Sequence, residues 1–313
     1  MSEIEDVLQK EFGDRLQTNT ELKDHVSLKV GGVSDYFLTV EKIEDLVHAV
    51  STAYKLKIPY FVLGGGYNIV PSDFGFPGLV IKNRCSNIVF SPEFSTVIVD
   101  SGVILGKLIN IAAGRDLGGL EFLFGVPGTV GGAIYGNAGA FGLEISDFVK
   151  SITMLVPKDS EMVLLKHSPK WMDFSYRSSI LKREYTDEKF KQVILTATLQ
   201  LVQRRKDEII RFMQENIKKK KDSQPLEETS AGSFFKNAGP RPENAAGYLL
   251  DQAGAKKLSV GGAAFSKKHA NFLVNRKNAT ATDIRSLAEK AKNIVKEKHN
   301  VDLNEEVEYI GKW

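Results

Sequence analysis

The chain has 313 residues, with 42 basic and 39 acidic side chains and a net charge of +3. This near balance excludes the strong positive field typical of nucleic-acid binding, and the single cysteine, Cys85, excludes a disulfide framework and an all-cysteine metal site. The acidic, amphipathic start has no signal-peptide pattern, and no apolar run approaches the ~20 residues of a membrane span. We therefore expect a cytosolic protein of roughly two or three domains, with no nucleic-acid or membrane partner.

Helix and strand patterns alternate along the first two thirds of the chain. Apolar residues at helical spacing predict helices at 4–12, 42–57 and 105–117, the last closed by two glycines. Short apolar or alternating runs predict strands at 60–64, 95–102 and 193–202.

The last third begins with a break in composition. A helix predicted over 206–218 runs into four lysines and then Ser-Gln-Pro, at 218–225. This run is typical of a domain boundary, or of a solvated helix end where cations complement the helix dipole. Another helix is predicted over 281–299, with Thr280 and Asp283 as a capping box and Asn300 at its C-terminal turn.

Two glycine clusters are candidate ligand-binding loops. LGGGYN at 63–68 follows a strand, and FGVPGTVGGAIYGNAGAFG at 124–142 has seven glycines in nineteen residues. Glycine permits close approach of backbone to a ligand, and successive exposed N–H groups bind anions. Neither loop has the P-loop or Rossmann pattern, so those nucleotide folds are not supported. Two such loops suit a diphosphate held between them, whereas the first loop alone is also typical of a tight turn.

These loops belong to a series of motifs that resembles one family. LGGGYN, GLEFLFGVPGTVGGAIYGNAGAFG, SYRSS, SAGSFFKN, LLDQAGAKKLSVGGAAFSKKHANFLVN and VDLNEEVEYIG occur in the order found in the UDP-N-acetylenolpyruvoylglucosamine reductases of peptidoglycan synthesis. HVSLKVGGVSDYFL at 25–38 is similar to the family's entry into its first domain. The chain length resembles the shorter variants, which lack an inserted substrate-covering loop.

The resemblance implies an α/β (α+β) protein with a FAD-binding fold of the vanillyl-alcohol oxidase type. The expected domains are a first FAD-binding subdomain at 1–82, a second at 83–221, and a C-terminal α+β substrate domain at 222–313. The implied reaction is the NADPH-dependent, FAD-mediated reduction of an enolpyruvyl ether of a UDP-sugar to a lactyl ether. We expect noncovalent FAD, a UDP-sugar as the small-molecule partner, and a monomer.

Three residues are implied to act on the substrate. Arg177 in SYRSS matches the arginine that binds the substrate carboxylate, since its guanidinium holds a carboxylate bidentately. Ser233 in SAGSFFKN matches the proton donor, and geometry matters more than acidity when the acceptor is a carbanion. Glu306 matches the C-terminal glutamate that, when protonated, hydrogen-bonds to the developing charge. Its neighbour Glu305 is the alternative, but the spacing to Ile310-Gly311 favours Glu306.

The remaining candidates are binding residues. We expect Asn237 to contact the uracil or the sugar, Lys221 and Lys256 to meet the diphosphate, and His269 and Asn271 to face the substrate; a surface role is the alternative for Lys221, Lys256, His269 and Asn271. The implied cofactor-binding residues are Gly64, Gly65, Gly66, Tyr67, Asn68, Pro127, Gly128, Thr129, Gly131, Gly132, Asn137, Ala138 and Gly139.

The chain departs from the family pattern at a few places. Tyr67 stands where serine is usual, Ala238-Gly239 separates Asn237 from the proline, Lys257 stands for glycine, and Phe141 for tyrosine. None of these removes a reacting group.

Two other functions fit parts of this sequence. One is a flavin oxidase of the same fold, which often has a histidine or cysteine that tethers the flavin, but neither glycine loop contains a histidine. The other is a non-enzymatic UDP-sugar binding protein, which the joint presence of Arg177, Ser233 and Glu306 disfavours. The five histidines are scattered without ligand spacing, so we expect no metal.

Overall fold

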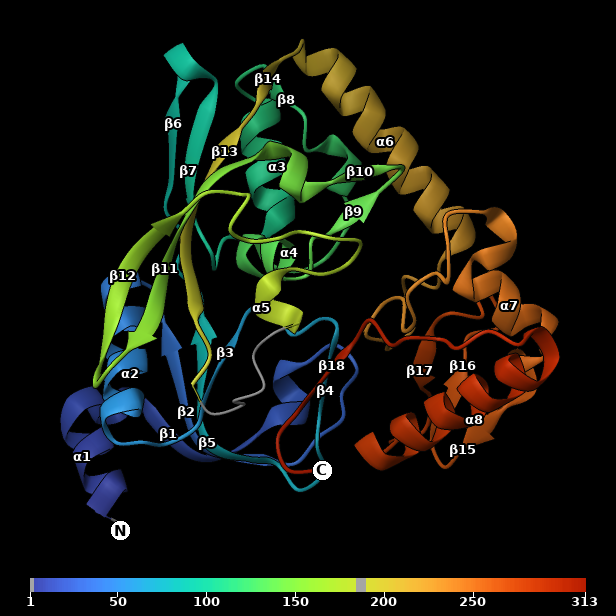
Figure 1. Cartoon of the computed structure of the whole chain (residues 1–313), viewed down its shortest axis with the longest axis horizontal. Helices are drawn as coiled ribbons and strands as arrows, with labels where there is room; N and C mark the ends of the chain where they lie inside the picture. Colours follow the sequence, from blue (N-terminus) through green and yellow to red (C-terminus); the bar gives the residue numbers. More distant parts are fainter. Residues whose placement is uncertain (1–2, 184–189) are drawn as a thin grey trace. The chain divides into compact units, whose positions relative to one another are not determined.

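The computed structural model describes residues 3–183 and 190–313, which form two compact units (Figure 1). Of the described residues, the first unit contains 3–18, 36–65, 78–183 and 190–218, and the second contains 19–35, 66–77 and 219–313. The chain passes from one unit to the other within strands β1 (Leu16–Glu21), β2 (Val33–Val40) and β5 (Phe76–Asn83), within helix α6 (Lys206–Ser223), and between Gly65 and Gly66. The predicted boundaries after residues 82 and 221 stay predictions.

The first unit is built around a five-stranded sheet in the order β12-β11-β13-β7-β6. Its antiparallel register pairs Ile152 of β11 with Ala197 of β13, and Ala197 with Val99 of β7. The elements of this unit are α1 (Glu3–Phe12), α2 (Ile43–Lys55), β3 (Tyr60–Leu63), β6 (Ile88–Ser91), β7 (Thr96–Asp100), α3 (Leu105–Ala113), β8 (Leu117–Gly118), α4 (Val130–Tyr135), β9 (Gly139–Ala140), β10 (Leu143–Glu144), β11 (Val149–Lys158), β12 (Glu161–His167), α5 (Ile180–Arg183), β13 (Val193–Gln200) and β14 (Val202–Gln203).

Two hydrophobic cores lie in this unit. One joins β7 and β13 to α3 and α4 and contains Val99, Leu108, Ile134 and Leu199. The other joins α1 and α2 to strand residues such as Leu79 and Leu195. From Leu195 onward strand β13 buries alternate residues, as its sequence predicts, whereas Val193 and Ile194 are also buried.

The second unit packs two helices against short strands. Its elements are β4 (Ile69–Pro71), α7 (Ala246–Gln252), β15 (Ser259–Val260), β16 (Ala263–Phe265), β17 (Leu273–Asn275), α8 (Ala281–His299) and β18 (Glu308–Ile310). Strands β15, β16 and β17 form an antiparallel sheet beside α8 (Figure 1), and β18 pairs parallel with β4. One core unites Ile284 and Leu287 of α8 with Leu250 of α7 and Phe234.

The predicted ends of α8 are confirmed. Thr280 and Asp283 form the capping box, and Asn300 ends the helix in the left-handed conformation with φ 54°. Two other predicted helix ends are wrong. Helix α3 ends at Ala113 rather than near 117, because Asp116 takes a left-handed conformation with φ 58°. Helix α6 continues through the lysines to Ser223, since lysine is a good helix former and Pro225 lies just beyond.

Candidate active site

The loop that contains Ser233 is held in the second unit by the residues around Asn271. The N–H of Phe234 donates to the carbonyl of Asn271 at 2.8 Å, and the N–H of Phe235 donates to its Oδ1 at 2.9 Å. Asn271 Nδ2 donates to the carbonyl of Phe235 at 2.8 Å. Phe234 and Phe235 are 0% and 1% exposed, so the two rings anchor the loop in the core while Gly232, with φ 101°, turns the chain ahead of Ser233.

The C-terminal segment lies along the other side of this loop. The N–H of Glu306 donates to the carbonyl of Phe234, and the N–H of Lys236 to the carbonyl of Asn304, both at 2.8 Å. The carboxylate of Glu305 is 3.8 Å from Lys292 of α8, so Glu305 faces that helix. The predicted role of the neighbouring Glu306 side chain stays a prediction.

An open pocket of about 420 Å³ lies in the second unit beside Ser233. It brings together five residues predicted from the sequence and three further polar residues that were not predicted. Its polar lining residues are Ser233, Asn237, Tyr248, Asp251, Lys256, Lys268, His269 and Asn271. Lys221, also predicted, is exposed and is not one of the lining residues; its carbonyl accepts a hydrogen bond from Lys268 Nζ.

The pocket is rich in hydrogen-bond donors. Lys256 Nζ pairs with Asp251 at 3.0 Å, and Lys268 adds a second cation. Burial, and then the charge of Lys256, lower the pKa of His269, which favours the neutral imidazole. The N–H of Asn271 donates to Nδ1 of His269 at 3.2 Å, so the proton of the neutral ring belongs on Nε2. Cations and N–H donors in one pocket suit an anionic ligand.

The first glycine loop is divided between the units. In the first unit, a methyl group built on Gly64 would meet Thr129 Oγ1 at 2.6 Å, so the end of β3 lies against the second glycine loop. In the second unit, Gly66 has φ 78° and a methyl there would lie 2.1 Å from the carbonyl oxygen of His25. Asn68 is left-handed, with φ 60°, and Tyr67 is exposed. Gly65 is the last residue before the chain enters the second unit.

Asn68 connects the two segments that carry the predicted reacting residues. Its N–H donates to the carbonyl of Ala231 at 3.1 Å, and its Nδ2 donates to the carbonyl of Glu306, also at 3.1 Å. Its own carbonyl accepts from Glu308 N–H at 2.9 Å. Asn68 therefore holds the Ser233 segment through its backbone N–H and the Glu306 segment through its side chain, a role that its sequence motif did not predict.

The second glycine loop of the first unit has an open surface. Thr129 caps α4, since its Oγ1 accepts from Gly132 N–H at 3.3 Å. Gly132 is exposed, and a methyl group there would have no protein atom nearer than 3.6 Å; at Gly128, with φ 115°, it would have none within 4 Å. Pro127 is also exposed. Backbone that is accessible in this way fits a cofactor that approaches the main chain closely.

Other glycines of this loop have structural partners. A methyl on Gly131 would lie 2.7 Å from Ser101 Cβ, and one on Gly139 would lie 2.8 Å from Arg177 Nη1. Ala138 forms backbone hydrogen bonds with Ala133 and Ile145. The predicted cofactor contacts of Gly131, Ala138 and Gly139 stay predictions.

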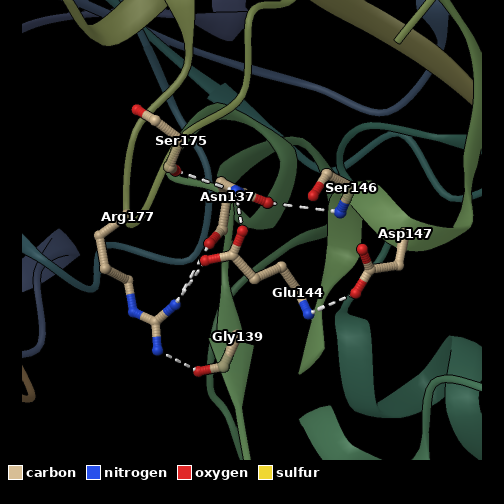
Figure 2. A network of polar contacts seen from close by, with 7 residues as sticks. All are labelled: Asn137, Gly139, Glu144, Ser146, Asp147, Ser175 and Arg177. Atoms are coloured by element: carbon tan, nitrogen blue, oxygen red, sulfur yellow. Dashed lines mark hydrogen bonds and ion pairs between the residues drawn. The ribbon is translucent and has the colours of Figure 1, made fainter. Parts of the chain in front are cut away.

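Arg177 lies in a polar network of the first unit (Figure 2). It is left-handed, with φ 53°, in a turn closed by hydrogen bonds between Ser175 and Ser178. Its guanidinium donates to the carbonyl of Gly139 at 2.5 Å and is 3.6 Å from a carboxylate oxygen of Glu144. Glu144 was not selected from the sequence, because an acid beside a glycine loop gives no sign of its partner.

Asn137 completes this network. Its Nδ2 donates to the other carboxylate oxygen of Glu144 at 2.6 Å and to the carbonyl of Ser175 at 3.0 Å (Figure 2). Its Oδ1 accepts from Ser146 N–H at 3.3 Å. The amide thus ties the glycine loop to the turn that carries Arg177, and a contact of Asn137 with the cofactor stays a prediction.

Among the described residues there is neither a membrane-spanning helix nor a metal-binding cluster. Across 3–183 and 190–313, no helix is both long and apolar enough to cross a bilayer. In the same part of the chain, no three His, Cys, Asp or Glu side chains gather where they would hold a metal ion.

Comparisons with known proteins place these features in one family. Residues 224–310 match the family described as UDP-N-acetylenolpyruvoylglucosamine reductase, C-terminal domain, and residues 34–165 match an FAD binding domain. A UDP-N-acetylenolpyruvoylglucosamine reductase of Clostridium novyi is 40% identical over 98% of this chain and 95% of its own length. One of Caldanaerobacter subterraneus is 36% identical over 95% of this chain and 94% of its own length.

A solved structure agrees with the sequence relatives. The UDP-N-acetylenolpyruvylglucosamine reductase of Thermus caldophilus is 33% identical, with a TM-score of 0.75 over 93% of this chain and 97% of that one. The predicted α+β fold with a FAD-binding domain is confirmed. The chain belongs to the UDP-N-acetylenolpyruvoylglucosamine reductase family and is an FAD-binding oxidoreductase.

Proposed function

We propose that this chain reduces UDP-N-acetylglucosamine enolpyruvate to UDP-N-acetylmuramate, a step of peptidoglycan precursor and cell-wall synthesis, with FAD as cofactor and NADPH as reductant. The curated relatives that cover nearly the whole chain are named for this reductase activity. The observation that supports it most directly is the pocket in which Ser233 lies with Asn237, Lys256 and His269.

The residues of the second unit suit a UDP-sugar. Lys256, Lys268 and the Nε2–H of His269 are donors for a diphosphate. Asn237 Oδ1 already accepts from Ala246 N–H at 3.0 Å, which directs its Nδ2 as a donor for the uracil or the sugar. A diphosphate held here presents the rest of the substrate to Ser233 on the same pocket wall.

The backbone at exposed Pro127 and Gly132 and at Gly128, where a methyl group would meet no other atom within 4 Å, would hold FAD in the first unit, together with Gly64 and Thr129. When bound, FAD would supply hydride to C3 of the enolpyruvyl group. Ser233 then donates its hydroxyl proton to C2, where negative charge develops. Arg177 holds the substrate carboxylate, and a protonated Glu306 donates a hydrogen bond to the carboxylate as charge builds up on it.

Anaerobic absorbance spectroscopy tests this function. Acid precipitation should release a yellow flavin, NADPH should bleach the oxidised-flavin band more rapidly than NADH, and the enolpyruvyl nucleotide should restore it. UDP-N-acetylglucosamine, which lacks the double bond, is the matched control and should leave the band bleached. Protein without flavin, or reduced flavin that the enolpyruvyl nucleotide does not reoxidise, would overturn the proposal. The single cysteine is compatible with a cytoplasmic monomer, which sedimentation and fractionation would check.

A further inference from the structure

Asn271 is the residue through which the pocket and the Ser233 loop are joined. The residue is 4% exposed, and its side chain both accepts a hydrogen bond from Phe235 N–H at 2.9 Å and donates one to the Phe235 carbonyl at 2.8 Å. Its carbonyl accepts from Phe234 N–H at 2.8 Å. Three bonds from one residue therefore fix the backbone of the two residues that follow Ser233. A buried amide with its groups satisfied in this way holds one geometry.

The same residue orients His269. The N–H of Asn271 donates to His269 Nδ1 at 3.2 Å, and the ring packs edge-to-face on Phe272, with centroids 5.1 Å apart. A methyl built on Gly247 would lie 2.8 Å from His269 Cε1, so the glycine leaves the space that the ring fills. With Nδ1 as the acceptor, the neutral ring presents N–H rather than a lone pair at Nε2.

We propose that Asn271 is a positioning residue that fixes the Ser233 hydroxyl and the Nε2–H of His269 relative to each other on the wall of the pocket. The side-chain amide and the carbonyl of Asn271 fix the loop that carries the proton donor, and its backbone N–H orients the ligand-binding imidazole. The inference rests on the proposed function, since it assigns Asn271 to the reduction of the UDP-sugar. It differs from a direct substrate contact, because the amide of Asn271 is directed at Phe235.

Asn275 offers a matched control in the same unit. It also makes side-chain bonds to backbone, donating to the carbonyls of Leu28 and Lys29 at 3.1 Å and accepting from Ala279 N–H at 2.8 Å. It is not among the residues that line the pocket. Replacing either asparagine with alanine removes comparable bonds, so a purely structural role predicts the same outcome for both.

Rapid mixing of the reduced holoenzyme with the enolpyruvyl nucleotide distinguishes a positioning role of Asn271 from a purely structural one. Asn271→Ala should slow flavin reoxidation at least roughly ten-fold at saturating substrate, with flavin reduction by NADPH within about two-fold of wild type. Asn275→Ala should lower the unfolding temperature comparably and leave reoxidation within about two-fold. In a Ser233→Ala background, Asn271→Ala should slow reoxidation much less than it does alone, because both changes impair the same function, proton donation by Ser233.

Two readouts do not depend on turnover. Hydrogen exchange of peptides spanning 232–236 should be faster in Asn271→Ala than in Asn275→Ala. In ¹⁵N-histidine-labelled wild type, nitrogen shifts should identify His269 as the Nε2–H tautomer, with His269→Gln for assignment. An Nδ1–H tautomer, or equal slowing of reoxidation by both alanine variants, would overturn the inference. Wild-type enzyme that the enolpyruvyl nucleotide fails to reoxidise would instead overturn the proposed function.

Discussion

The N–H of Glu306 donates to the carbonyl of Phe234 at 2.8 Å, which ties the C-terminal segment to the residue that follows Ser233. The two segments are more than seventy positions apart in the chain. Asn68 strengthens the connection by bonding both Ala231 and the carbonyl of Glu306. The backbones that carry the proposed proton donor and the proposed glutamate are thus ordered together, which geometry-dependent proton transfer requires.

Ser233→Ala should affect one half of the reaction. The hydroxyl is needed only when charge develops on the substrate, so flavin content and flavin reduction should stay near wild type. Reoxidation by the enolpyruvyl nucleotide should slow by roughly 10²–10⁴-fold, the usual contribution of a positioned acid or base. Ser233→Cys should recover part of the rate, since a thiol also carries a proton. Rapid-mixing absorbance checks each half separately, with Ser230→Ala as the control in the same loop. Unchanged reoxidation in Ser233→Ala would mean that another group supplies the proton.

Arg177→Lys should lower turnover on the order of 10²-fold with FAD still bound and still reduced. Lysine keeps the charge, but it loses the planar guanidinium, which contacts both Gly139 and Glu144. Without this planar group it cannot also hold the substrate carboxylate with two parallel hydrogen bonds. Arg183→Lys is the control, because Arg183 pairs with Asp173 in the same segment at an exposed position. Steady-state kinetics on both variants give the comparison. If the two lysine variants behave alike, Arg177 has only a structural role in its turn.

Gly131→Ala and Gly132→Ala should have opposite effects on stability. A methyl at Gly131 meets Ser101 Cβ at 2.7 Å, so this variant should lose about 1–3 kcal/mol of unfolding free energy through overpacking. At exposed Gly132 the nearest atom is 3.6 Å away, and alanine should gain about 0.5–1 kcal/mol as a better helix former.

Flavin content then tests the cofactor role of Gly132. If FAD approaches the backbone there, the stable Gly132→Ala protein should copurify with less FAD and bind added FAD more weakly. Thermal unfolding of the apoprotein and the ratio of flavin to protein absorbance are the measurements. A full complement of FAD in Gly132→Ala would place the cofactor elsewhere on the loop.

Local features of the fold could be predicted from the sequence, whereas the contacts that build the site could not. Thr280, Asp283 and Asn300 act within one helix, so their spacing is sufficient to predict its ends. The bonds between Asn271 and Phe235 join residues 36 positions apart, and those between Asn137 and Ser175 join residues 38 apart. Sequence patterns indicate which residues are polar, but the partner of a buried amide depends on tertiary packing.

Cys85 should be inert in the folded protein. It is 0% exposed, and burial together with the charge of Asp100 raises the pKa of its thiol to about 12. Only roughly 10⁻⁴ of the thiol is then ionised near pH 8, and the thiolate is the reactive form. Iodoacetamide should label the native protein far more slowly than the unfolded protein, as intact mass spectrometry would measure. Rapid native labelling would show that Cys85 is accessible.

Glu305→Gln should raise stability at neutral and alkaline pH. Burial, which outweighs the attraction of Lys292, raises the pKa of the Glu305 carboxyl above its ordinary 4.5. The folded state then binds more protons than the unfolded state in the window above 4.5, so ionisation of Glu305 costs stability as the pH rises through that window. Glutamine has no such cost. The variant should therefore unfold at a higher temperature than wild type near about pH 8, and the difference should shrink as the pH falls below 4.5, where Glu305 becomes protonated in both states.

The matched control for this change is Glu289→Gln, because Glu289 pairs with the same Lys292 at 2.9 Å from an exposed position. An exposed pair contributes only about 0–1 kcal/mol, so this variant should lose a little stability or none at any pH at which Glu289 is ionised. Thermal melts across the pH range on wild type and both variants provide the comparison. If Glu305→Gln loses stability near about pH 8 while Glu289→Gln does not, the attraction of Lys292 for Glu305 outweighs its burial, and Glu305 is ionised in the fold at a net gain.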